Sequence, residues 1–188
     1  MVVEAFAPKA WACSVSEIDW SARGFEGTKL GYLIGQAGYF HDGHRAVDVA
    51  ASRSLADAID LQTQTKQAHW NVKGPQFYQL HLLYDTLAEG LAGYVDEIAE
   101  RATALGGVAM GTARMAAANT RLPEYPAAAT NSMESVQCLV DRYAHVAAST
   151  RSALDEADKA GDADTVDLFT EISRDLDKWL WFLEAHLQ

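Results

Sequence analysis

One stretch between two chain breaks constrains the fold more than any other. Between Pro75 and Gly106-Gly107, apolar residues recur every three or four positions, the spacing of one buried face of a helix. They are Leu80, Tyr84, Leu87, Leu91, Tyr94, Ile98, Ala102 and Leu105. We therefore predict a helix from Gln76 to Leu105, with Pro75 suited to its first turn and the glycine pair ending it.

A second face of this helix carries potential ligands. His81 and Asp85 are four residues apart, as are Asp96 and Glu100, so each pair shares a face. At 100° per residue, all four fit within a sector of about 100° beside the apolar stripe. Small residues lie between them and would let another helix approach: Ala88, Ala92, Ala99 and Thr103.

The charges of this helix have one sign. From Gly74 to Glu100 there is no Lys or Arg, whereas a solvated face usually interleaves Glu with Lys. Five acids fall in this range: Asp85, Glu89, Asp96, Glu97 and Glu100. Carboxylates packed without a base need a cation, and imidazole with carboxylate suits iron, zinc or manganese better than calcium. The alternative is a surface histidine among acids that aid solubility.

Helix geometry limits such a metal site. Asp85 and Asp96 are eleven residues apart, or roughly 16 Å along the axis, so one ion cannot bridge them. If a second copy packs antiparallel across a two-fold axis near Leu91, His81 and Asp85 of one subunit would meet Asp96 and Glu100 of the other. Two glycines would ease that approach: Gly90 and Gly93. The residues therefore predict a metal site shared between two subunits.

The rest of the chain from residue 46 also has helical spacing. We predict helix one over 46–72, a short helix over 113–119 within a long connection, helix three from a capping box at Asn131, and helix four from Asp162 or Asp164. The fold class is all-α: a four-helix bundle with a short extra helix between helices two and three.

Residues 1–45 have a different character. Six glycines fall between Gly24 and Gly43 among several aromatic residues, which predicts an irregular arm that packs against something. Within it, His41 and His44 flank Asp42 and Gly43. These histidines are either metal ligands or part of a turn, and we favour the turn.

Composition restricts location and partners. No apolar run approaches the 18 residues of a membrane span, and the first twenty residues do not resemble a secretory signal. Two cysteines, Cys13 and Cys138, form no disulfide framework, so we expect a cytoplasmic protein without a membrane association. The formal net charge of −11 opposes binding to DNA unless a basic tail offsets it.

Several motifs together resemble the Dps family, the DNA-protection-during-starvation miniferritins. They are the run KQAHWNVKGPQF, the segment DEIAERATALGG and, near the C-terminus, RDLDKWLWFLEAHL. The family has a His on helix one, a His twelve residues on, then an Asp, an Asp and a Glu at intervals of four, eleven and four. Those positions hold His69, His81, Asp85, Asp96 and Glu100. The resemblance covers about residues 46 to 188.

This resemblance implies a ferritin-like fold and an iron chemistry. The five matched residues would be the ligands of ferroxidase sites shared across a two-fold axis, in a hollow homo-oligomer of twelve subunits. Iron would be oxidised there by hydrogen peroxide or dioxygen and stored as Fe³⁺ mineral, which protects DNA indirectly. Trp70 is interpreted as core or interface packing, or, by the resemblance, as a neighbour of the iron that intercepts oxidising equivalents.

The resemblance also implies an uptake route for Fe²⁺. Asp162, Asp167 and Glu171 gather where helix four begins, and in the family such acids line pores at a three-fold axis. The alternative is that they only stabilise the positive end of that helix.

Two other functions stay open. One is a nucleoid-associated protein that coats DNA directly; the other is a shell that stores another metal such as zinc. The lysine-rich tail with which some Dps proteins hold DNA is absent, so we expect no direct DNA binding.

Overall fold

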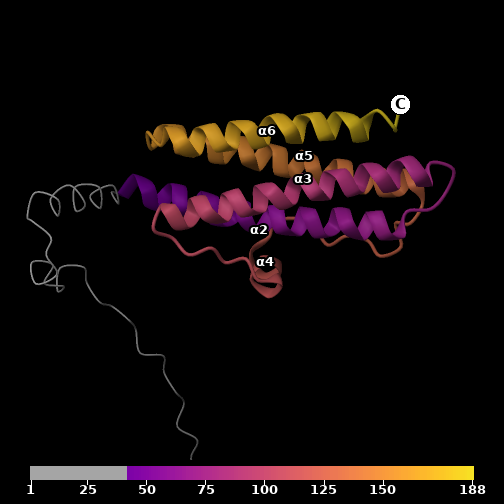
Figure 1. Ribbon diagram of the computed structural model, residues 1–188, viewed down its shortest axis with the longest axis horizontal. Helices are drawn as coiled ribbons and strands as arrows, with labels where there is room; N and C mark the ends of the chain where they lie inside the picture. Colours follow the sequence, from indigo (N-terminus) through magenta and orange to yellow (C-terminus); the bar gives the residue numbers. More distant parts are fainter. Residues whose placement is uncertain (1–41) are drawn as a thin grey trace, which may run out of the picture. The chain divides into compact units, whose positions relative to one another are not determined.

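The computed structural model describes residues 42–188, and over that range the chain forms five helices and no strand. With the labels of Figure 1, they are α2 (Asp42–Asn71), α3 (Phe77–Ala104), α4 (Ala113–Asn119), α5 (Ser132–Lys159) and α6 (Ala163–Glu184). The all-α prediction and the short extra helix between the second and third long helices are confirmed. The predicted arm lies outside the described residues, except for its last four positions.

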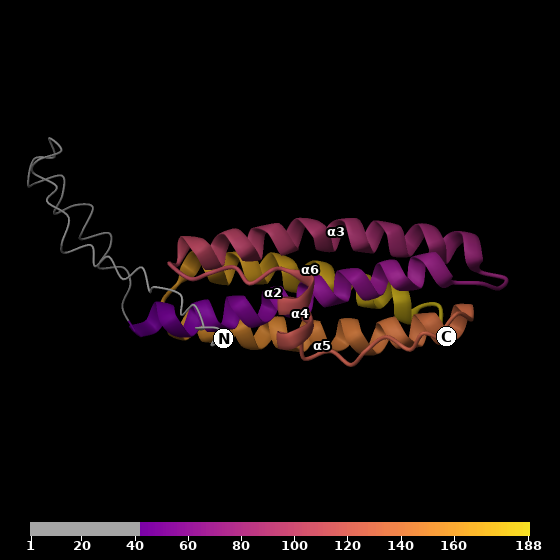
Figure 2. The same ribbon diagram turned by 90° about the horizontal axis from the view of Figure 1, so that it is seen from below.

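The four long helices form a bundle of two antiparallel pairs, α2 with α3 and α5 with α6 (Figures 1 and 2). The connection over residues 105–131 runs along the bundle, so α5 begins beside the α2–α3 turn. There the Lys73 amide donates to the Thr130 carbonyl (2.8 Å), and the Ser132 hydroxyl donates to the Lys73 carbonyl (2.6 Å). One long crossover among short turns is the topology of ferritin-like bundles.

The predicted apolar stripe of α3 is the centre of the core. All eight of its members are buried, and Tyr84, Leu87 and Leu91 are almost completely so. Facing helices contribute Tyr143, Phe169, Leu176 and Trp179. At about 1.5–3 kcal/mol per large apolar side chain buried, this stripe makes a large contribution to the bundle's stability.

The helix ends agree with their capping signals in most places. Asn131 caps α5 by accepting from the Met133 amide, and Asp162 caps α6 by accepting from the Thr165 amide. Gly106 and Gly161 follow α3 and α5 with φ of +88° and +74°, a conformation that favours glycine. Pro75 lies in the turn before α3 rather than inside its first turn.

The start of α2 differs from the prediction. The helix begins at Asp42 instead of residue 46, so Asp42, Gly43 and His44 are helical and the predicted turn is wrong. A glycine so close to a helix start costs little, because the first amides have no intrahelical partner in any case. His41 lies outside the described residues.

Gly90 has a different role from the predicted one. A Cβ atom at this position would lie 2.5 Å from the Trp179 ring of α6, so the glycine lets α3 and α6 approach within one subunit. Gly93 has no atom of the described chain within 4 Å of such a Cβ, so it alone is available to a neighbouring helix. Near this contact the Tyr94 hydroxyl donates to Asp175 (2.7 Å).

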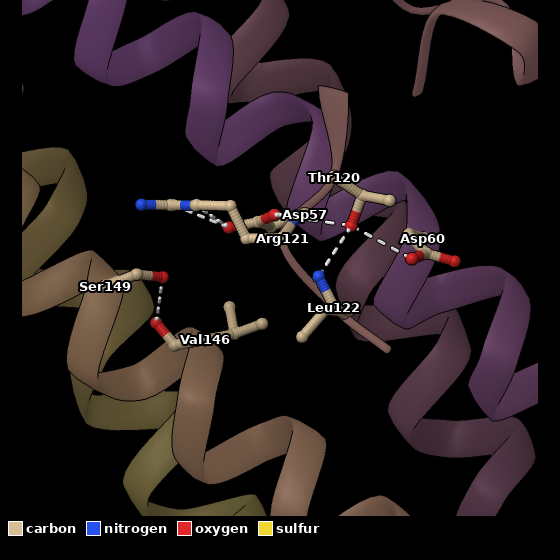
Figure 3. A network of polar contacts seen from close by, with 7 residues as sticks. All are labelled: Asp57, Asp60, Thr120, Arg121, Leu122, Val146 and Ser149. Carbon is tan, nitrogen blue, oxygen red and sulfur yellow. Dashed lines mark hydrogen bonds and ion pairs between the residues drawn. The ribbon is translucent and has the colours of Figure 1, made fainter. Parts of the chain in front are cut away.

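An ion pair between a buried carboxylate and a partly exposed guanidinium attaches the crossover connection to α2 (Figure 3). The completely buried Asp57 accepts from the Arg121 amide (2.8 Å) and from Nε and Nη2 of its guanidinium (2.9 and 2.5 Å). Thr120 donates to Asp60 on the same helix (2.9 Å). A carboxylate this deep is tolerated only because its lone pairs are filled.

A second polar anchor holds the following residues. The buried Arg142 of α5 donates to the Glu124 and Cys138 carbonyls (both 2.8 Å) and to the side chain of Gln64. Its guanidinium also lies 5.5 Å from the centre of the Tyr125 ring.

Across residues 42–188, no helix has the length and apolarity needed to cross a bilayer.

We expect Arg121→Ala to lower the free energy of unfolding by about 2 kcal/mol, because the buried Asp57 loses two hydrogen bonds from a charged donor. The matched control is Arg151→Ala, which removes an exposed pair with Asp177 (2.8 Å) and should lose at most about 1 kcal/mol. Denaturant unfolding of both variants measures the difference. Equal losses would show that the Asp57 pair does not stabilise the fold more than a surface pair.

Candidate metal centre

The α2–α3 turn brings two of the predicted ligands together. His69 lies in the last turn of α2 and His81 in the second turn of α3, and their rings stack with centroids 3.8 Å apart. His69 Nδ1 donates to the His81 carbonyl (2.8 Å), and His81 Nδ1 donates to the His69 carbonyl (2.9 Å). Each histidine is therefore oriented by the backbone of the other.

These reciprocal hydrogen bonds decide which ring nitrogen is free. A carbonyl oxygen only accepts, so each Nδ1 must carry its proton, and in a neutral ring Nε2 then has a lone pair. A backbone carbonyl on the far nitrogen is the usual support of a metal-binding histidine. Both rings are thus prepared to bind a metal through Nε2.

Asp85 lies beside His69. Its Oδ1 lies 3.9 Å from His69 Nε2, too far for a hydrogen bond but on the same side of the α2–α3 pair. The same oxygen accepts from Lys66 Nζ at 2.5 Å. The Lys66 hydrogen bond, with the charge of Lys66, holds the pKa of Asp85 below its ordinary value. The carboxylate is therefore ionised over the whole neutral range.

Lys66 is a basic partner that the charges of α3 alone do not show. No Lys or Arg lies between Gly74 and Glu100, but α2 supplies Lys66 for Asp85, so the prediction of acids without a base is wrong at this position. The sequence spacing could have indicated this base, because Lys66 is three residues before His69 and so shares its face of the helix. The support for a metal site at Asp85 therefore comes from the two oriented histidines, because the charge of Asp85 is already paired with Lys66.

Asp96 and Glu100 do not join this group. Both are exposed on α3, eleven and fifteen residues after Asp85, with no ion pair formed between either acid and the described part of the subunit. Among residues 42–188, no three His, Cys, Asp or Glu side chains converge to hold a metal ion. One subunit thus presents two separate partial ligand sets on the same helix.

An exposed aromatic surface lies beside the histidines. Trp70 is 68% exposed and Tyr78 69% exposed, while Phe77 and Leu82 are about half exposed. Trp70 is therefore not a core residue, which corrects one of the two packing interpretations. Its ring centre is 6.0 Å from Lys66 Nζ, and the Phe77 ring lies 5.2 Å from that of His81.

The acids at the start of α6 divide into two kinds. Asp162 is buried and accepts from Arg101 Nη2 (2.6 Å) and from the Thr165 hydroxyl (2.7 Å). Burial alone would raise the pKa of Asp162, but these hydrogen bonds and the Thr165 amide outweigh it and hold the pKa below normal. Asp167 and Glu171 are exposed. Asp162 is thus engaged as a cap within the subunit, and only the other two acids are free to face a channel.

Proteins with similar sequences belong to families that have this architecture. The ferritin-like domain family matches residues 50–188. A DNA protection during starvation protein of Agrobacterium fabrum is 49% identical over 137 residues, which cover 73% of this chain and 85% of that protein.

Solved structures agree as well. A Dps protein from Bacillus brevis has a TM-score of 0.75 at 29% identity, over 79% of this chain and 99% of that one. Dps from Vibrio cholerae, described as a ferritin-like diiron-carboxylate protein, has a TM-score of 0.74 at 25% identity, over 78% and 91% of the two chains. With the bundle topology and the matching family domain, these likenesses establish that the chain belongs to the Dps family of ferritin-like proteins.

Proposed function

We propose that the protein oxidises Fe²⁺ at ferroxidase sites shared between subunits and stores the product as Fe³⁺ mineral inside a hollow shell of twelve subunits. His69, His81 and Asp85 of one subunit would bind the ion together with Asp96 and Glu100 of its partner. Hydrogen peroxide is the proposed oxidant, and dioxygen is the alternative oxidant. We place the protein in the cytoplasm.

The observation that carries this proposal is the division of the ligands into two partial sets. The histidine set is oriented and has free Nε2 atoms, yet it offers a single carboxylate. The acidic set, Asp96 with Glu100, is exposed and has no histidine. An antiparallel second copy would bring the two sets together twice per dimer, with Gly93 open to the approaching helix.

The exposed aromatic surface supports association at the same place. Trp70, Phe77, Tyr78 and Leu82 are exposed and lie within four residues of His69 or His81 along the chain, and exposed apolar side chains of this size often mark an interface. Covering them by a second subunit would also exclude water from the metal. The Trp70 ring would then be near the iron, in a position to be oxidised in place of DNA.

The chemistry itself is simple. Two Fe²⁺ ions and two protons convert one hydrogen peroxide into two waters, leaving two Fe³⁺ ions and no hydroxyl radical. Asp85 and the other acids would balance the charge of the ferrous ions, and the histidines would supply nitrogen donors through Nε2. A zinc store would use similar ligands, and peroxide consumption that depends on Fe²⁺ distinguishes the two functions.

A mixed shell tests whether the site is shared. Subunits with His81→Ala/Asp85→Ala and subunits with Asp96→Ala/Glu100→Ala should each be inactive alone. When co-assembled at random, half of the dimers are mixed and each regains one of its two sites, so about a quarter of the wild-type oxidation rate should return.

The control for this experiment mixes the two kinds of preformed shell without subunit exchange, and no activity should return. If well-folded co-assembled shells stay inactive, the ligands do not come from two subunits.

Iron uptake tests the proposed pore. We expect Asp167→Asn/Glu171→Gln to slow Fe²⁺ uptake by about tenfold at low ionic strength, because copies of both acids around one axis would focus a negative potential. A matched control, Glu124→Gln/Asp155→Asn, removes two exposed acids elsewhere. Equal uptake by both variants, measured by stopped-flow oxidation, would contradict the pore.

DNA binding separates this function from a nucleoid protein that coats DNA. Duplex binding needs several Lys or Arg in reach of phosphates, whereas every subunit here adds −11 to the shell. We expect no retardation of DNA in a gel at neutral pH and near-physiological salt, and any binding bridged by Mg²⁺ or Fe²⁺ should vanish with a chelator.

Retardation that resists the chelator and weakens steeply with salt would favour the DNA-coating function. The bases to replace in that case are Lys9, Arg23 and Lys29.

A further inference from the structure

The carboxylate oxygen that would bind a metal already binds a cation of the protein. Lys66 Nζ lies 2.5 Å from Asp85 Oδ1, and His69 Nε2 lies 3.9 Å from the same oxygen. Lys66 is on α2 one turn before His69, so the ammonium, the imidazole and the carboxylate meet at one point between α2 and α3. The Lys66 ammonium therefore occupies the Asp85 oxygen that would bind a shared metal ion.

Two cations cannot use this oxygen together without strong repulsion. A metal bonded to Oδ1 at about 2 Å would lie within a few ångströms of Nζ, where unit charges still interact by roughly 1 kcal/mol even in bulk water. A divalent ion is attracted to the carboxylate about twice as strongly as an ammonium, so it can replace Lys66. The replacement lowers the net gain from binding the metal.

A second position for the ammonium lies close by. Lys66 Nζ is already 6.0 Å from the centre of the Trp70 ring, at the limit of a cation–π contact, and the ring is 68% exposed. The flexible lysine stem allows the ammonium to leave Asp85 and move over the indole without any change in the backbone. The displaced charge therefore remains stabilised near the site.

We propose that Lys66 is a displaceable cation that occupies the metal position of Asp85 in the metal-free protein and sets the affinity of the site for divalent ions. Lys66 is not a ligand: it holds the carboxylate until a metal ion replaces it. The inference rests on the proposed shared metal site. The experiment below distinguishes a wrong role for Lys66 from the absence of the metal site.

The test is calorimetric titration of the full-length assembled protein with Zn²⁺, which binds without redox chemistry. Lys66→Met keeps the length of the side chain but removes the competitor, so the affinity for Zn²⁺ should rise about two- to fivefold, the range of an exposed ion pair. Lys66→Arg places a two-pronged donor on Asp85, so its affinity should be equal to or below wild type. The charge control is Lys73→Met, an exposed lysine in the α2–α3 turn, which should leave the affinity unchanged.

Each alternative predicts a different order. If Lys66 serves to orient Asp85 for the metal, Lys66→Met should bind Zn²⁺ more weakly than wild type, and the proposal is overturned. Unchanged affinity in Lys66→Met also overturns it. A separate variant, Asp85→Asn, reports on the site itself: if it binds Zn²⁺ as wild type does, the metal site is absent and the proposed function fails, whatever the effect of Lys66.

Discussion

The pairing of α2 with α3 through their two histidines determines what this molecule presents to its surroundings. Each ring is attached to the backbone of the opposite helix, so the turn between the helices is held closed from within. That arrangement leaves both Nε2 atoms without a backbone partner, and the Nε2 atom of His69 lies 3.9 Å from Asp85 Oδ1. Without it, the imidazoles would be two unrelated side chains on a surface.

Much of this arrangement is predictable because it depends on periodicity. The apolar stripe of α3, the short helix over 113–119 and the Asn131 cap follow from spacing and side-chain type, and the structure agrees with each. The grouping of His69 with His81 came from the family resemblance, since their separation of twelve residues has no meaning until the chain reverses at Gly74. The sharing of ligands between subunits remains a prediction, based on the rise of a helix.

The features that could not be predicted are long-range polar pairs. Asp57 with Arg121, Arg101 with Asp162, and Lys66 with Asp85 each join positions 19 to 64 residues apart. No local pattern distinguishes such a partner from any other charged residue. Gly90 shows the same limit, because its spacing on α3 suited an approach between subunits, whereas its small size is needed by Trp179 of its own chain.

The split of the ligands along α3 has a further consequence for regulation. Under the proposed function, a free subunit holds the parts of two sites and completes neither, so activity depends on protein concentration through the equilibrium of association. Newly made chains would be inert toward iron until enough of them accumulate to assemble. The cell would then have an enzyme without a separate switch, since assembly of the container and activation of the chemistry inside it are one event.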